Sequence, residues 1–277
     1  MKPKYCYLNG SIIPLSEAKV GVYDIGLLRG FGIYEALVVR HGKAFRFADH
    51  MERFVRSAQE LRIVIPATAE EIEKAILELA AKNGYHDAVV RLILTGGESI
   101  GGIEYDGTKP TFYILVEAFM PLPEKYFTEG CSLMPFNFVR QFPKLKTINY
   151  IQAVLLQEER KKQGALEVLY TDGERVLEAA TSNFFIITAG KVITPKEGIL
   201  GGITRKVAIE LASQTHTVDE RDVTMAEVYA ADEAFITSSF KDIVPVVKVG
   251  EHTIGTGTPG LITKDLMGRM HKYIEAY

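Results

Sequence analysis

The sequence predicts a mixed α/β (α+β) fold divided into two domains, and three observations support this prediction. At 277 residues the chain is longer than most single domains. Segments with strand patterns alternate with segments of helical periodicity along most of its length. A proline pair in Met120-Pro121-Leu122-Pro123-Glu124 interrupts this alternation and indicates a boundary. We therefore predict an N-terminal α/β domain over 1–118, a linker over 119–125 and a larger C-terminal α/β domain over 126–277.

The first elements are two β-hairpins. Tyr5–Leu8 has the composition of a strand, Asn9-Gly10 is a hairpin turn, and Ser11–Ile13 is the returning strand. The run Tyr34–Val39 is followed by His41-Gly42, a second turn of the same kind. Both hairpins are expected within the N-terminal domain.

Two helices and two longer strands complete the predicted N-terminal domain. Apolar residues of 49–61 recur on one helical face. Thr68 and Glu71 have the spacing of a capping box, so a second helix is expected to begin there. The runs 88–94 and 111–119 are rich in β-branched and aromatic residues and predict strands.

The C-terminal part continues the alternation of strands and helices. Its predicted strands are 131–135, 166–170, 184–188 and 233–238, and its predicted helices are 150–163, 204–215 and 260–275.

The composition is that of an ordinary globular protein. Hydrophobic residues make up 47%, charged residues 24%, and the formal net charge is −3, so no electrostatic feature favours nucleic acid or an anionic membrane as a partner. No apolar run has membrane-spanning length, and the N-terminal stretch lacks a secretory pattern. We therefore expect a cytoplasmic protein.

Cysteine and histidine usage predicts no disulfide framework and no metal site. The two cysteines, Cys6 and Cys131, are isolated. The six histidines, at 41, 50, 86, 216, 252 and 271, form no HxxxH or HExxH arrangement, which argues against a zinc hydrolase.

Three motifs of the C-terminal part point to one cofactor. Lys146 lies in Lys-Thr-Ile-Asn-Tyr, Glu178 lies in Leu-Glu-Ala-Ala-Thr-Ser-Asn-Phe-Phe, and Gly201-Gly202-Ile203-Thr204-Arg205 begins a helical pattern. An amine, a carboxylate and a glycine-led helix start are what pyridoxal 5′-phosphate (PLP) requires of a protein. No single one of the three is specific.

The order and spacing of these motifs resemble the fold-type IV PLP enzymes, the class IV aminotransferases. That group includes branched-chain aminotransferases, D-amino-acid transaminases, R-selective amine transaminases and aminodeoxychorismate lyases. The resemblance extends from Asn9 to about residue 272. It implies the two-domain fold of type IV, with a smaller N-terminal and a larger C-terminal domain, and a homodimer.

The resemblance also implies roles for the residues around the lysine. Lys146 would form the Schiff base with PLP and then move protons, and Lys144 competes with it for this assignment. Tyr150 would bond the 3′ oxygen of the cofactor, the alternative being core packing at a helix start. Glu178 would pair with the ring nitrogen and keep it protonated.

The phosphate group would be held by several segments. Gly-Ile-Thr-Arg matches the family motif, so Ile203 and Thr204 become phosphate ligands through their amides and the threonine hydroxyl. Ser238 and Ser239 are expected to add a hydroxyl. Arg53, in His-Met-Glu-Arg, matches the family's phosphate-binding arginine; without the resemblance it would be a solvent-facing helix arginine.

The substrate side departs from the family pattern. Where many relatives have tyrosine and an acidic residue, this chain has Arg29 and Phe31, and Tyr34 is retained as a pocket residue. Arg29 and Arg91 are the candidates for binding a substrate carboxylate, with a structural ion pair as the alternative for each. The arginine-x-histidine pair of the standard D-amino-acid transaminases is replaced by Thr-Gly-Gly at 95–97.

These observations predict a PLP-dependent transaminase that moves an amino group between an amino acid and an α-keto acid. A D-amino-acid transaminase with a carboxylate clamp built on Arg29 and Arg91 is favoured. The alternatives are a branched-chain L-amino-acid aminotransferase and an aminodeoxychorismate-type lyase. A binding or scaffold protein without PLP would require Lys146 or Glu178 to have no function.

Overall fold

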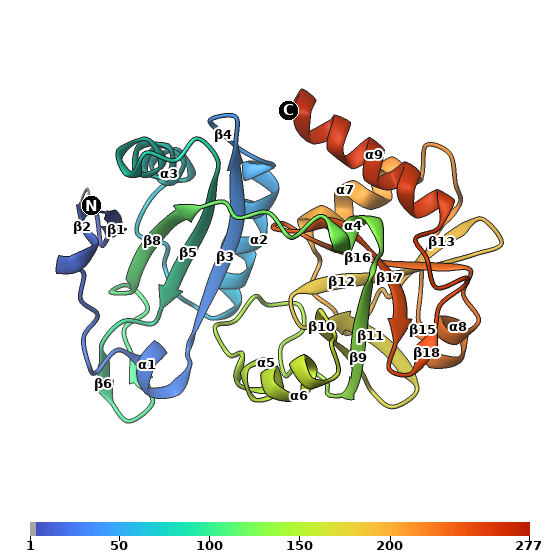
Figure 1. Ribbon diagram of the computed structural model, residues 1–277. Helices are drawn as coiled ribbons and strands as arrows, with labels where there is room; N and C mark the ends of the chain where they lie inside the picture. Colours follow the sequence, from blue (N-terminus) through green and yellow to red (C-terminus); the bar gives the residue numbers. More distant parts are fainter. Residues whose placement is uncertain (1–3) are drawn as a thin grey trace. The chain divides into compact units, whose positions relative to one another are not determined.

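The computed structural model describes residues 4–277, and its contacts divide the chain into two compact units (Figure 1). The first unit comprises the residues up to Met120 together with Leu145–Asn149, and the second comprises Pro121–Lys144 and Tyr150–Tyr277. The segment that contains Lys146 thus packs with the first unit, although it follows the predicted linker. Met1–Pro3 belong to the N-terminal stretch considered for secretion and lie outside the described residues.

The first unit is a six-stranded antiparallel sheet in the order β2-β1-β8-β5-β3-β4. Its strands are β1 (Tyr5–Leu8), β2 (Ser11–Pro14), β3 (Gly32–Arg40), β4 (Lys43–Ala44), β5 (Ala88–Thr95) and β8 (Thr111–Ala118); β6 (Ser99–Gly101) and β7 (Glu104–Tyr105) form a separate ribbon. Its helices are the 3-10 turn η1 (Leu15–Glu17), α1 (Ile25–Arg29), α2 (Phe47–Glu60) and α3 (Ala69–Asn83).

The predicted N-terminal elements are confirmed. Asn9 and Gly10 have φ values of 45° and 95°, and His41 and Gly42 have 50° and 76°, so both hairpin turns use left-handed backbone at two successive positions. Thr68 and Glu71 form both hydrogen bonds of the capping box that begins α3.

Strand alternation decides which side chains of the first unit face its helices. In β3, Ile33, Leu37 and Val39 contribute to one core cluster with the apolar faces of α2 and α3. Glu35 shares their parity and therefore points toward the helices. Tyr34 has the opposite parity, and so does Arg91 on β5, since it lies opposite Ala36 of β3.

The second unit is built on a closed ring of strands. β12 pairs with β16, and the order continues through β17, β9 and β10 to β11, which pairs back with β12. The strands are β9 (Cys131–Asn137), β10 (Glu167–Thr171), β11 (Arg175–Ala179), β12 (Ser182–Thr188), β13 (Lys191–Thr194), β14 (Val218–Glu220), β15 (Val223–Thr224), β16 (Glu233–Ser238), β17 (Asp242–Val249) and β18 (His252–Thr253). The helices are α4 (Lys125–Thr128), α5 (Ile151–Leu155), α6 (Gln157–Lys162), α7 (Ile203–Ala212), α8 (Met225–Tyr229) and α9 (Leu261–Ala276).

Both faces of this ring are covered with apolar side chains. Phe184 and Ile236 belong to the inner core. Phe185 and Phe235 point outward and stack with ring centroids 4.5 Å apart, on the side where α7 and α9 contact the strands.

The predicted helix over 150–163 is interrupted: α5 and α6 are separated at Leu156, where ψ is 1°.

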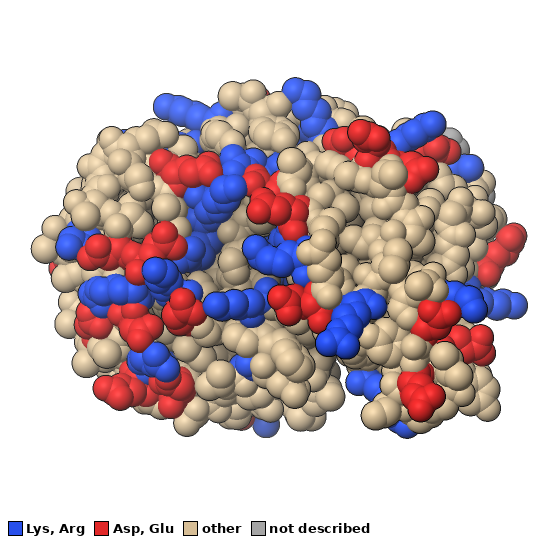
Figure 2. Space-filling model, turned by 180° about the vertical axis from the view of Figure 1, so that it is seen from behind, with Lys and Arg blue, Asp and Glu red and all other residues tan. Residues whose placement is uncertain are grey.

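The surface carries charges of both signs. On the face shown in Figure 2, Lys and Arg side chains are interspersed with Asp and Glu side chains. Within residues 4–277, no helix combines the length and the apolar character needed to cross a membrane.

Candidate active site

The lysine segment is hydrogen-bonded to the start of β3, where Ile33 forms an isolated bridge with Thr147. The amide of Tyr34 donates to the carbonyl of Lys146 (2.8 Å), and the amide of Ile148 donates to the carbonyl of Gly32 (3.1 Å). These bonds place the Nζ atom of Lys146 4.4 Å from the centroid of the Tyr34 ring. The competing residue Lys144 is 75% exposed and pairs with Glu197 at 3.4 Å. The structure thus places Lys146, and not Lys144, beside a predicted pocket residue.

A buried ion pair holds the predicted phosphate arginine. The Glu35 carboxylate accepts from Nε and Nη2 of Arg53 at 2.9 and 2.6 Å. Nδ1 of His50 lies 3.0 Å from the same carboxylate, and all three residues are buried. Two bonds to one carboxylate fix the plane of the guanidinium, so Arg53 is oriented in advance of any ligand.

The protonation of this group follows from burial and charge. Burial alone would raise the pKa of Glu35, but Arg53 and the hydrogen bond with His50 outweigh it and hold this pKa well below its usual range. Burial lowers the pKa of His50 despite the adjacent carboxylate, which keeps the imidazole neutral at neutral pH. Sequence reasoning missed Glu35 and His50. The signal that could have revealed Glu35 is a carboxylate within an otherwise apolar strand.

In the second unit, Glu178 is buried and held from three sides. It accepts from the amide of Leu200 (3.0 Å) and from Nδ2 of Asn183 (3.4 Å), and it pairs with Nη1 of Arg140 at 3.2 Å. These contacts fix the position of the carboxylate, which the resemblance assigns to the ring nitrogen of the cofactor. Arg140 was not predicted from the sequence, because it lies in an irregular segment with no motif of its own.

A second buried network lies at the turn between β11 and β12, which directly follows the strand that carries Glu178. The buried Glu167 accepts from the amide of Thr181 (2.8 Å) and the hydroxyl of Ser182, and it pairs with Lys241 at 2.6 Å. The turn that joins β11 to β12 is thereby tied to β10 and to Lys241, the residue before β17. Sequence reasoning missed Glu167 and Lys241 as well.

Three neighbouring strands arrange polar side chains in a row. Glu178 of β11 lies opposite Asn183 of β12, which in turn lies opposite Thr237 of β16. Asn183 and Thr237 share the outer face of the ring, because their neighbours Phe184 and Ile236 point inward. Two strand spacings separate the ends of this row, about 10 Å. That span accommodates the distance from ring nitrogen to phosphate in PLP.

The start of α7 lies beside this row. The N-cap Gly202 gives the helix no side-chain cap, so the amides of Ile203 and Thr204 remain available for an anion. Nδ2 of Asn183 donates to the carbonyl of Leu200 (2.7 Å), which ties the loop to β12. A Cβ on Gly202 would collide with the side chain of Asn183, so only glycine fits there.

Two hydroxyls at the end of β16 indicate that the row binds a ligand. Within residues 4–277, Oγ1 of Thr237 and Oγ of Ser238 are buried without a hydrogen-bond partner. Buried hydroxyls are normally satisfied, so these two are expected to bond a bound group. Together with the amides at the start of α7, they form a donor set suited to a phosphate. Ser239 follows directly and is half-buried. The residues present therefore fit PLP.

The remaining predicted residues lie in different surroundings. Tyr150 is the N-cap of α5. The pKa of Tyr170 is raised to about 12, first by burial and then by the nearby Tyr150. Arg29 is exposed at the end of α1 and donates to the carbonyl of Leu28 (2.9 Å). Arg91 pairs with Glu117 across the sheet, with 39% of its side chain exposed. The structure thus brings Tyr34 next to Lys146. The two arginines contact other groups: Arg29 bonds a backbone carbonyl and Arg91 pairs with Glu117.

Comparison with known proteins agrees with this arrangement. The profile of amino-transferase class IV matches residues 32–249. A putative branched-chain-amino-acid aminotransferase of Methanocaldococcus jannaschii is 34% identical over 94% of this chain and 93% of its own. A D-alanine aminotransferase of Staphylococcus haemolyticus is 30% identical over 98% of each chain. The crystal structure of a branched-chain amino acid aminotransferase from T.th. with pyridoxamine 5′-phosphate superposes with a TM-score of 0.92, at 27% identity, over 100% of this chain and 95% of the other.

The fold and the matched profile define a class IV aminotransferase of fold type IV. This chain belongs to that family, whose members use pyridoxal 5′-phosphate and act on amino and keto acids. The predicted family, fold class and cofactor are thereby confirmed.

Proposed function

We propose that this protein is a PLP-dependent transaminase that exchanges an amino group between a D-amino acid and an α-keto acid. The observation that carries the aminotransferase part is the row Glu178–Asn183–Thr237 at the start of α7, which fits the cofactor in a chain that belongs to the class IV family. The preference for D-amino acids is a finer proposal and rests on other residues.

The chain's own side chains would divide the work. Glu178, supported by Arg140, would hold the proton on the ring nitrogen. The amides of Ile203 and Thr204, the hydroxyls of Thr237 and Ser238, and the Arg53 guanidinium would bind the phosphate. Tyr150 and Ser239 are proposed to add bonds to the 3′ oxygen and to the phosphate.

Proton transfer is assigned to Lys146. When bound, PLP withdraws electrons from the bonds at the substrate Cα and so makes the Cα proton acidic. The Nζ atom of Lys146 would accept that proton and return it to the cofactor side. Tyr34, whose ring lies 4.4 Å from Nζ, limits the positions that the amine can take. Water is excluded from the neighbouring Glu35–Arg53 pair by burial.

The handedness proposal rests on the cations available for a substrate carboxylate. The chain lacks the arginine-x-histidine pair of standard D-amino-acid transaminases but has Arg29 and Arg91. Arg91 lies opposite Ala36, which is two residues from Tyr34 on β3, so Arg91 and Tyr34 lie on the same face of the sheet. D-alanine aminotransferases match nearly the whole chain at 30% identity. These observations favour a D-amino acid whose carboxylate is bound by arginine.

A branched-chain L-amino-acid aminotransferase is the second candidate. The relative at 34% identity is named as a putative member of that group, and the superposed structure with pyridoxamine 5′-phosphate is a branched-chain amino acid aminotransferase. The catalytic residues would be the same, and only the side of the cofactor that receives the carboxylate would differ.

A half-reaction with single amino acids distinguishes these candidates. The PLP-loaded protein is mixed with D-alanine, D-glutamate or L-leucine, and conversion of the bound cofactor is followed by its visible absorbance. Faster conversion by the D-amino acids supports the proposal, and faster conversion by L-leucine establishes the second candidate. If no amino acid converts the cofactor, the transaminase assignment fails. Pyruvate release from aminodeoxychorismate without a keto acid would identify a lyase.

We also propose a homodimer, on the basis of an exposed apolar surface of the first unit. Val22, Tyr23 and Leu27 are 72%, 63% and 70% exposed, and Ile100 of the β6–β7 ribbon is 69% exposed. The amide of Ser99 donates to the carbonyl of Tyr23 (2.8 Å), so the two segments are adjacent. Patches of this kind mark protein interfaces. Arg29 lies on the same short helix as Leu27, so a second copy would cover its surroundings.

Light scattering tests the dimer. The wild-type protein should have twice the mass of one chain, and Leu27→Asp should shift it toward the monomer. Leu261→Asp is the control, because Leu261 is 82% exposed in the second unit. A monomeric wild type would overturn the proposal.

A further inference from the structure

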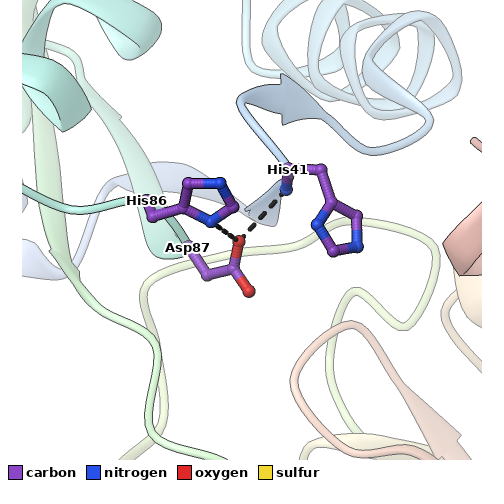
Figure 3. A group of neighbouring side chains, drawn as sticks. All are labelled: His41, His86 and Asp87. Carbon is purple, nitrogen blue, oxygen red and sulfur yellow. Dashed lines mark hydrogen bonds and ion pairs between the residues drawn. The ribbon is translucent and has the colours of Figure 1, made fainter.

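Three side chains that can bind a metal meet at one end of the first unit's sheet. His41 lies in the turn between β3 and β4, and His86 and Asp87 directly precede β5. Val39 of β3 lies opposite Ala88 of β5, so the strand register places the turn next to the segment 86–87. Figure 3 shows the two imidazoles on either side of the Asp87 carboxylate.

Hydrogen bonds hold this cluster together. Oδ1 of Asp87 accepts from the backbone amide of His41 (3.1 Å) and lies 3.0 Å from Nδ1 of His86 (Figure 3). The rings of His41 and His86 meet edge to face, with centroids 6.0 Å apart. One nitrogen of each imidazole and one oxygen of the carboxylate all lie within 4.8 Å of one another. The turn is therefore oriented by the same carboxylate that would bind a metal.

We propose that His41, His86 and Asp87 bind one divalent transition-metal ion, of which zinc is the probe used below. Two imidazole nitrogens and one carboxylate oxygen suit Zn²⁺, Cu²⁺ and Ni²⁺, whereas Mg²⁺ and Ca²⁺ prefer oxygen ligands. Metal–ligand bonds of about 2.0–2.2 Å require the three atoms to approach one another more closely than they do here. Rotation of the His86 ring supplies this movement, because its side chain is 77% exposed.

One neighbouring cation limits which oxygen can bind. Nη1 of Arg40 lies 3.7 Å from Oδ2 of Asp87, and its guanidinium stacks at 3.6 Å on the ring of Phe119. The arginine is thus held on the Oδ2 side of the carboxylate. The metal would bind on the Oδ1 side, which faces Nδ1 of His86 and the backbone of His41, and water would complete its coordination.

Calorimetric titration tests the proposal on the PLP-loaded, full-length protein after removal of any histidine tag. Zinc chloride should bind the wild type with one equivalent at this cluster. His86→Ala and His41→Asn should each weaken that binding by about tenfold or more. Asparagine is chosen for position 41 because it tolerates left-handed backbone, as φ is 50° there. The control is His271→Ala, which removes an exposed histidine of α9 and should bind zinc like the wild type.

Thermal unfolding gives a second readout that does not depend on enzyme activity. An ion that binds only the folded chain raises the unfolding midpoint with increasing concentration. Zinc should raise the midpoint of the wild type and of His271→Ala more than that of His86→Ala. If the wild type shows no saturable binding, or if His86→Ala and His41→Asn bind zinc as tightly as it does, the proposed site is refuted.

Discussion

Replacing Glu35 by glutamine is the sharpest test of how the phosphate arginine is held. The substitution keeps the size of the side chain but removes the charge that balances Arg53. Two bonds from the guanidinium, at 2.9 and 2.6 Å, end on this carboxylate, and Glu35 is fully buried. The variant would deprive the buried Arg53 of the charge of this carboxylate.

The expected loss of stability follows from this burial. Removing one partner of a buried ion pair costs about 3–5 kcal/mol, whereas an exposed pair contributes about 0–1 kcal/mol. At about 2–4 °C per kcal/mol, Glu35→Gln should lower the unfolding midpoint by about 6–20 °C. Glu117→Gln is the matched control, because it breaks the ion pair with Arg91 in the same sheet, where Glu117 is 60% exposed. It should move the midpoint by a few degrees at most.

The stability difference should also depend on pH. Because the native pKa of Glu35 is lowered, its contribution is complete above the unfolded-chain pKa, about 4.3, and is lost as the pH falls below it. At pH 3 the gap between wild type and Glu35→Gln should therefore be about 2 kcal/mol smaller than at pH 7.

Urea unfolding at pH 7 and pH 3 measures these differences, and equilibrium dialysis measures PLP binding. Glu35→Gln should bind PLP more weakly than the wild type, because Arg53 is no longer held in one orientation. If Glu35→Gln is as stable as Glu117→Gln, or if the gap does not change with pH, the reasoning about the buried pair is wrong.

Three further predictions concern the proposed catalytic residues. Lys146→Ala should lose at least about 1,000-fold in transamination rate and form no borohydride-stable PLP adduct. Lys144→Ala should retain the wild-type rate and form the adduct, and equal activity of the two variants would contradict the assignment of Lys146. Glu178→Gln should lower the rate by about 100-fold or more and shift the visible absorbance of bound PLP, because the ring nitrogen loses its anionic partner; an unchanged spectrum would argue against that contact. Arg29→Leu should raise KM for amino acids by about tenfold with little change in kcat or in PLP binding, and an unchanged KM would assign Arg29 to structure.

Local patterns in the sequence determined much of the first unit. The turns at Asn9-Gly10 and His41-Gly42 and the capping box of α3 depend on neighbouring residues, and they were predicted correctly. The cofactor and the fold family were predicted from the resemblance of the motifs around Lys146 and Glu178, in their order and spacing, to the class IV aminotransferases. In each case the interacting residues are close in sequence or belong to a distinctive pattern.

Tertiary structure alone decided the contacts between distant segments. The chain brings Glu35 to Arg53, Arg140 to Glu178, and His41 to His86, and no local pattern encodes any of these pairs. The patterns HxxxH and HExxH detect only histidines that lie on one helix. His41 and His86 are 45 residues apart in sequence, and the register of β3 and β5 brings them together. Side chains meet where strands pair and helices pack, and that arrangement is a property of the whole fold.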